Sequence, residues 1–391
     1  MKKIVIISAL IVIVSNLFAQ GSVDSVLIEI EENNKSLVAM RKSSDAERIG
    51  NKTGIYLQNP EMEFNYLWGS PSAIGNRTDF SIKQTFDFPT AYSFKNQVSK
   101  LKNEQLDLEY QKKLKEIQFE SRLICFDLIY INAMMSALNY RYEHAKSIAQ
   151  AYQSKFDTGE TSLLEYNKSQ LNLLNVKSKL ASIEIERNML LADLARMNGG
   201  NPINFTDSVF HAVMLPDDLE QWYVEAEQFN PMLAWIKKEI EISQKLVGLN
   251  NAMNLPKLQA GYMSETVAGE KFQGLSVGLS IPLWENKNTV KFEKANTLAL
   301  ISMETDNKFQ FYAQLKALHA KTISMHKSTA QYRTGLLLFN NEVLLKKALE
   351  QGELSLIDYM LELSFYYVSV DLLLEMEKKM FKAYAELQQY Y

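Results

Sequence analysis

The chain has 391 residues, a hydrophobic fraction of 47% and a formal net charge of −4. This acidic balance argues against a nucleic-acid-binding protein, which would need basic patches. Glycine (15 residues) and proline (8 residues) are scarce for this length, which predicts few turns and therefore long secondary-structure elements.

The first residues of the chain predict export. Two lysines precede an apolar run over residues 4–14, and Ala19 offers a small residue at a cleavage point. This is the pattern of a secretory signal peptide over residues 1–19, too short to span a membrane. Beyond it no run of 18 or more apolar residues occurs, so no transmembrane helix is expected. The single cysteine, Cys125, allows no intramolecular disulfide.

A short helix over residues 22–50 and two segments of alternating polarity come next. The segments, about 59–69 and 77–88, are predicted to be strands. One face of the second carries Phe80, Ile82, Gln84, Phe86 and Phe88, and the other carries Ser81, Lys83, Thr85 and Asp87. At about ten residues, each run is long enough to cross a bilayer as a tilted strand. A soluble sheet with one solvated face would show the same alternation.

After Pro89 the spacing of apolar residues changes from every second residue, as in a strand, to the three- and four-residue spacing of a helix. Long helices are predicted over about 94–156 and 161–197, with Gly159 between them. The first contains a row of apolar or small residues spaced by three and four: Ile117, Ser121, Ile124, Leu128, Ile131, Met135, Leu138, Tyr142, Ala145, Ala149, Tyr152 and Phe156. This seven-residue repeat indicates coiled-coil packing, and a helix of this length measures on the order of 90 Å.

Residues 201–254 predict a separate, equatorial helical segment between two halves of the chain. Prolines punctuate it, and Trp222 and Trp235 suggest that its helices are packed. Beyond it the earlier order of elements returns, with strands expected over about 255–266 and 272–283 and helices over about 288–349 and 354–391.

Two pairs of segments match at an offset of 193 residues, which indicates an internal duplication. Residues 156–166 and 349–359 share the order apolar, acid, any, Gly, Glu, any, Ser, Leu, aliphatic, acid, Tyr. The same offset aligns residues 80–89 with 273–282, two alternating runs that both end in proline.

Each predicted repeat, 20–200 and 255–391, holds two strands, and four strands are too few for a membrane barrel. An open sheet would leave unpaired N–H and C=O groups in hydrocarbon, each at a considerable cost in free energy. If the strands span a membrane, several chains must share one barrel, and three chains would supply twelve strands.

A glycine turn is predicted after the first long helix of each repeat. Gly159 and Gly352 suit this position because glycine readily takes the left-handed conformation at a helix C-terminus. Ser162 and Ser355 are placed to cap the helices that return. These four residues predict a helical tip in each repeat.

Acidic residues surround both turns: Glu160, Glu165, Glu353, Asp358 and Glu362. Glu165 and Asp358 follow the capping serines by three residues, as in a capping box, so one interpretation is a purely structural role. The other depends on assembly. In a trimer each acid recurs three times around one axis, where a ring of carboxylates would favour cations and gate a pore.

Several of these features together resemble the TolC family of outer-membrane efflux factors, over essentially the whole mature chain. They are the duplicated strand pairs, the strand ending in Pro282-Leu283-Trp284, the long helices and the two glycine turns. The resemblance implies a mainly α fold with a small membrane β part, in a homotrimer whose twelve-stranded β-barrel continues into an α-helical barrel through the periplasm.

The resemblance also implies a function: a passive, non-enzymatic duct in the outer membrane that needs no cofactor. Such a duct docks at its tip, here around Gly159, Gly352, Ser162 and Ser355, onto a periplasmic adaptor. The adaptor connects it to an inner-membrane pump of the resistance-nodulation-division or ABC type.

By motif position, the pore-closing acid of the family falls on Asp358. The next family acid falls on Leu361, with Glu362 beside it, and the tip arginine falls on Leu354. The closing network is therefore expected to differ here in detail.

Three other functions compete with this one. The outer-membrane component of type I protein secretion is an alternative within the same class. A periplasmic adaptor would have one hairpin between soluble β-domains, and an exported enzyme would need a convergent polar cluster that the sequence does not suggest. No metal site is predicted, since His319 and His326 form a weak pair and the sixteen methionines are better explained as core gap-fillers.

Overall fold

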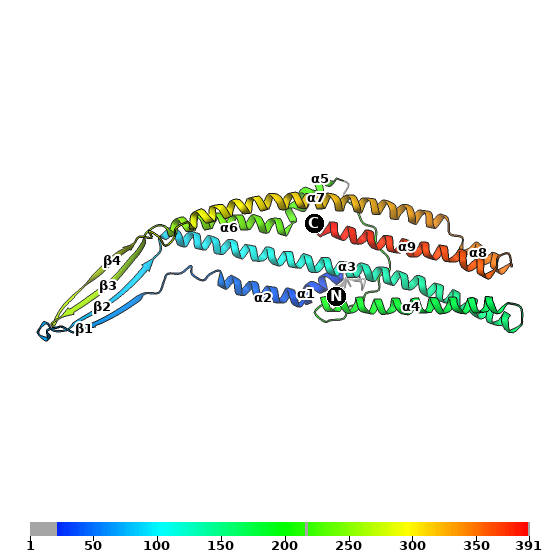
Figure 1. The fold of residues 1–391 in the computed structure, drawn as a ribbon, viewed down its shortest axis with the longest axis horizontal. Coiled ribbons are helices and arrows are strands. Elements are labelled where there is room, and N and C mark those ends of the chain that lie inside the picture. The colour runs from blue at the N-terminus through cyan, green and yellow to red at the C-terminus, as the bar shows by residue number, and fades with distance from the viewer. Residues whose placement is uncertain (1–21, 216–217, 390–391) are drawn as a thin grey trace, which may run out of the picture. The chain divides into compact units, whose positions relative to one another are not determined.

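The computed structural model describes residues 22–215 and 218–389, so the predicted signal peptide lies outside the described residues. The elements follow in the order α1 (Val23–Asn33), α2 (Lys35–Gly50), β1 (Glu61–Leu67), β2 (Arg77–Phe86), α3 (Pro89–Asp157), α4 (Leu163–Met197), α5 (Leu219–Phe229), α6 (Pro231–Met253), β3 (Lys257–Val267), β4 (Glu270–Ser280), α7 (Thr289–Leu338), α8 (Glu342–Glu350) and α9 (Leu356–Gln388) (Figure 1). A single turn of 3₁₀ helix, Ser72–Ile74, connects β1 to β2. The chain is thus mainly helical with one four-stranded sheet, as expected.

The chain divides into two compact units that do not follow the order of the sequence. Among the described residues, one unit comprises 22–35, Glu116–Leu215 and Leu318–Gln389, and the other comprises Ser36–Lys115 and residues 218–317. Each unit therefore takes segments from both predicted repeats, and the long helices α3 and α7 contribute to both.

The sheet is antiparallel throughout, in the order β1-β2-β3-β4. Two hairpins, one from each repeat, join where β2 pairs with β3, for example at Ile82 and Tyr262. Figure 1 shows these four strands side by side at the end of the helices that carry them. The sequence separation between β2 and β3 means that this central pairing is a long-range contact.

The register of the strands gives the sheet one apolar and one polar face. Met62, Ile82, Tyr262 and Leu275 are successive cross-strand partners and so share a face. The neighbouring row, Glu63, Ser81, Met263 and Gly274, lies on the opposite face. On the apolar face Leu275 is 88% exposed and Val277 is 85% exposed. This band of apolar side chains has no cover within the described chain.

Ion pairs run across the polar face. Lys83 Nζ lies 3.6 Å from a carboxylate oxygen of Glu63, and Arg77 Nε lies 3.0 Å from one of Glu265. A face with paired charges and hydroxyls is suited to water, while the opposite face is suited to hydrocarbon.

The stretch expected as one helix over 288–349 is two helices, which corrects the prediction. α7 ends at Leu338 and α8 begins at Glu342. Between them the side chain of Asn340 accepts a hydrogen bond from the backbone N–H of Glu342 at 3.0 Å and donates one to the Tyr366 hydroxyl at 3.0 Å. Asparagine competes in this way with backbone hydrogen bonds, so the helix breaks without glycine or proline at the break.

The short helix expected over 22–50 is likewise two helices, α1 and α2, that meet at Asn34. The buried Asn34 side chain donates a hydrogen bond to the carbonyl of Met197 at 2.8 Å.

The first long helix begins at Pro89 and not near residue 94, because proline is well suited to the first position of a helix.

One described helix, α3, is long and apolar enough by length and composition to cross a membrane. Its most apolar 18-residue window has a mean hydropathy of 1.3, and 44% of that window is buried within the chain. By this test of length and composition, α3 departs from the expectation that no helix beyond the signal peptide could span a membrane. Core helices of soluble proteins pass the same test, so this is weak evidence for a span.

Candidate functional site

The two predicted glycine turns have nearly the same backbone geometry. Gly159 has φ +74° and Gly352 has φ +76°, both left-handed. The N–H of the residue after each glycine bonds back five residues, from Glu160 to Lys155 at 2.7 Å and from Glu353 to Ala348 at 2.9 Å. With the glycine N–H bonded three residues back in both turns, each is a Schellman motif that closes the preceding helix.

The serines after these turns cap the returning helices. Ser162 accepts a hydrogen bond from the N–H of Glu165 at 3.2 Å, and Ser355 accepts one from the N–H of Asp358 at 3.1 Å. The acids do not complete a capping box. The carboxylate of Glu165 accepts from the Thr161 hydroxyl and that of Asp358 from the Ser355 hydroxyl, both at 2.6 Å.

The acids named from the sequence differ in their surroundings. Glu160, Glu353, Asp358 and Glu362 are exposed, whereas Glu165 is half-buried. In α9, Asp358 and Glu362 are four residues apart, so they lie on the same side of the helix. Leu361, on which the second acid of the TolC motif falls by position, is 53% exposed. An apolar side chain therefore lies beside these two carboxylates.

Near the second turn, a cluster of polar groups connects α3 and α9. His144 on α3 bonds to two tyrosines of α9: Tyr359 Oη lies 2.9 Å from Nε2, and Tyr367 Oη lies 3.3 Å from Nδ1. Arg141, one turn before His144, binds both carboxylate oxygens of Asp371, at 2.6 and 3.1 Å. These bonds hold the helix that follows the turn against α3.

Burial shifts the pKa values of His144 and Tyr359 in the direction that favours their neutral forms. Burial lowers the pKa of His144 below its ordinary value of 6.5 and raises the pKa of Tyr359 to about 12. A neutral imidazole has one donor and one acceptor nitrogen, and it can pair with both tyrosine hydroxyls. The pKa of Tyr140 is raised to about 12, chiefly by its hydrogen bond to Glu342 on α8.

The sequence did not predict this cluster, because Tyr359 and Tyr367 lie 215 and 223 positions away from His144 along the chain. The repeated motif contained a signal, since its last residue is Tyr359 in one copy and Tyr166 in the other. Tyr166 stacks on Phe156 at 5.0 Å within the first turn, whereas Tyr359 is 1% exposed. Among the described residues, no group of three or more His, Cys, Asp or Glu side chains is arranged to hold a metal ion.

The architecture built from these elements occurs in solved outer-membrane channels. The Campylobacter jejuni CmeC outer membrane channel matches with a TM-score of 0.73 at 13% identity, over 94% of this chain and 85% of that chain. CusC, in structures that concern transmembrane channel formation, matches with 0.75 at 12% identity, over 94% and 91%. The open state of the Neisseria gonorrhoeae MtrE channel matches with 0.72 at 11% identity, over 94% and 88%. No family model and no curated protein sequence matches the chain.

Proposed function

We propose, from the TolC-like fold that this chain shares with solved outer-membrane channels, that it is one subunit of a homotrimeric outer-membrane channel. The channel would be a passive, non-enzymatic conduit in a tripartite efflux or export system, receiving its cargo from an inner-membrane pump through a periplasmic adaptor. The observation that carries this proposal is the four-stranded sheet, whose apolar face is uncovered and whose two edges are unpaired by any of the residues that the structure describes.

The edges of the sheet favour closure by copies of the same chain. Within residues 22–215 and 218–389, β1 and β4 each have one neighbouring strand, so in this part of the chain each leaves a row of backbone donors and acceptors unpaired. In an antiparallel sheet of four strands, β4 of one copy and β1 of the next also run antiparallel. Three copies therefore make a closed barrel of twelve strands, with the apolar face towards lipid and the charged face towards water.

The helices also present surfaces that require a partner. Four apolar residues of α4 that follow one another at spacings of seven, three and eleven residues are exposed: Leu164, Leu171, Leu174 and Ile185. An exposed row with this spacing is the pattern by which helices pack together in coiled coils. In the proposed trimer, the neighbouring copy covers this row and extends the barrel of strands into a barrel of helices.

The two glycine turns are proposed as the periplasmic tip. Asp358, Glu165, Glu362, Glu353 and Glu160 would form the acidic gate, and Gly159, Gly352, Ser162 and Ser355 would form the surface on which the adaptor docks. The bonds from Arg141 and His144 to α9 support a gate in which α9 is held in place from α3. The same architecture would also serve type I protein secretion, since the pump selects the cargo.

Fractionation and cross-linking test this proposal. A Cys125→Ala background allows one cysteine on each edge strand, Asn65→Cys on β1 and Ser276→Cys on β4, both on the polar face. In outer-membrane vesicles, a short bismaleimide should link copies into dimers and trimers and stop there, while either single cysteine variant should not form trimers. Recovery of the mature protein as a soluble periplasmic monomer would refute the channel and favour an adaptor.

A further inference from the structure

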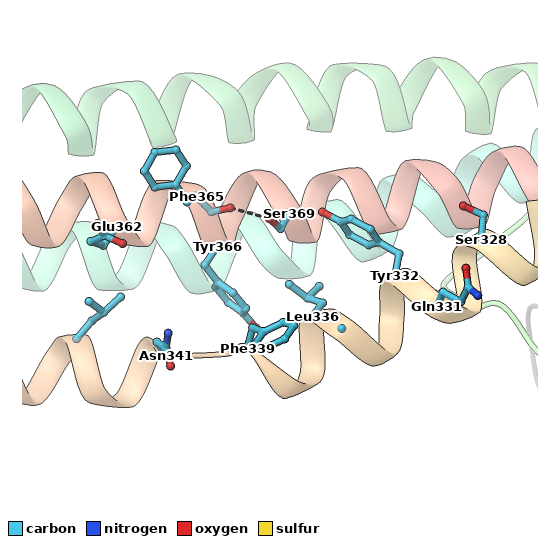
Figure 2. A pocket seen from close by; sticks show the side chains of 12 residues that line it. Ser328, Gln331, Tyr332, Leu336, Phe339, Asn341, Glu362, Phe365, Tyr366 and Ser369 are labelled. Carbon is cyan, nitrogen blue, oxygen red and sulfur yellow. Dashed lines mark hydrogen bonds between the residues drawn. The ribbon is translucent and has the colours of Figure 1, made fainter.

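A groove opens beside the helix break of the second repeat, between α7 and α9. Its volume is about 650 Å³, and Figure 2 shows several of its side chains between the two helices, whereas Phe365 points away from α7. The break between α7 and α8 lies in the wall of this groove, since Phe339 and Asn341, the residues on either side of Asn340, both line it.

The walls of the groove combine aromatic rings with a single carboxylate. Tyr332 and Leu336 of α7, Phe339 just after the end of α7, and Tyr366 of α9 lie between the helices, with the rings of Phe339 and Tyr366 side by side (Figure 2). Glu362 is the one charged residue among the described residues that line the groove. Aromatic faces attract cations, and a carboxylate without a basic neighbour in the lining adds to that attraction.

The side of α9 on which the groove opens is also the side of the candidate gate. Asp358, Glu362 and Ser369 follow one another at spacings of four and seven residues, which places them on one face of the helix. Glu362 and Ser369 line the groove. If Asp358 faces the pore, as proposed above, the groove is reached from the pore.

We propose that this groove is a binding site for aromatic organic cations, with the positive charge at Glu362 and the ring system against Tyr332, Phe339 and Tyr366. A neutral aromatic molecule would lack the carboxylate contact, and an inorganic cation would lack the ring contacts. Access from the pore rests on the proposed channel function, whereas binding to the groove is a property of the chain itself.

Binding of ethidium to the purified, detergent-solubilised protein tests the site by isothermal titration calorimetry. Glu362→Gln should weaken binding roughly tenfold, and Tyr332→Leu several-fold, because each removes one of the two attractions. Glu350→Gln removes an exposed carboxylate at the end of α8, outside the lining and outside the candidate gate, and should leave binding unchanged. The affinity should also fall with added salt, and phenanthridine, the uncharged parent ring, should not displace ethidium.

Equal loss of binding in Glu362→Gln and Glu350→Gln would show attraction to the general acidity of this end of the chain and overturn the assignment. Unchanged binding in both Glu362→Gln and Tyr332→Leu would place ethidium elsewhere and also overturn it. Single-channel conductance without ethidium separates the two proposals. If the protein conducts normally but its ethidium binding is not weakened by Glu362→Gln and Tyr332→Leu, the site alone is refuted. If the protein does not conduct but these two variants weaken ethidium binding, the channel alone is refuted.

Discussion

The Tyr359 hydroxyl lies 2.9 Å from Nε2 of His144, and this bond links the helix after the second glycine turn to α3. Tyr359 directly follows Asp358, the residue placed by its motif at the candidate gate. The position of α9 at the tip therefore depends on a buried polar contact as well as on apolar packing.

Tyr359→Phe should loosen this part of the tip. The substitution keeps the ring but leaves the half-buried imidazole with one partner fewer, at a cost of about 1 kcal/mol. Backbone amides at the start of α9 should exchange faster with deuterium than in the wild type. Tyr312→Phe, which removes an exposed tyrosine bond to Glu220, is the control and should leave the exchange of α9 unchanged. Equal exchange in all three proteins would show that the bond contributes little.

The stability of the protein should fall in mild acid because of His144. Its pKa in the folded protein is lowered by burial, with Glu342 acting to raise it and Lys346 to lower it. The unfolded chain binds the proton more readily, so the contribution is fully present above the unfolded pKa, about 6.5, and decreases as the pH falls through the lower folded value. Melting temperatures between pH 5 and 8 test this, and His144→Gln is expected to flatten the profile.

Gly352→Val should destabilise the second turn for conformational reasons alone. A Cβ atom added at Gly352 would meet nothing within 4 Å, so the cost arises from φ +76° and not from a clash. A residue with a Cβ pays about 1–2 kcal/mol in the left-handed region, and a β-branched one more. Gly352→Asn should be tolerated far better, because asparagine enters this region readily. Thermal unfolding and efflux by the two variants provide the comparison, and equal efflux would argue against a role of this turn in docking.

Asp358→Ala, alone or together with Glu165→Ala, should raise single-channel conductance and reduce cation preference. Removal of the carboxylates takes away the negative charge proposed to favour cations at the narrow tip. Asp358→Asn keeps the size of the side chain and should act in the same direction, which separates charge from shape. Planar-bilayer recordings in which conductance and selectivity stay at wild-type values would exclude an acidic gate at these residues.

Charges placed on the two faces of the sheet should have different effects. Val277→Lys puts a charge on the apolar face and should cost about 2–4 kcal/mol if that face meets the middle of the bilayer. Ser276→Lys, one residue away on the polar face, should assemble normally. The yield of trimer in outer-membrane fractions is the measurement, and equal yields would contradict the assignment of the faces.

Local features of the fold could be predicted from the sequence. Alternation marked the four strands, apolar spacing marked the long helices, and Gly159 and Gly352 marked the turns whose left-handed backbone the structure contains. The duplication added the expectation that both halves repeat one arrangement. Each of these features depends on interactions between residues that are close together in the chain, so it can be predicted from the amino-acid sequence.

The long-range contacts could not be read in this way. The sequence placed Asp358 in a motif, but only the tertiary structure brought His144 to Tyr359, across 215 positions of the chain. The break at Asn340 was missed for a similar reason, since its side chain bonds to Tyr366 on another helix. By itself the sequence determined which elements form and where they turn, because backbone conformation and amphipathic period are local. The tertiary structure decided which polar groups meet between helices and where a groove opens, because those outcomes depend on contacts between residues far apart in the chain.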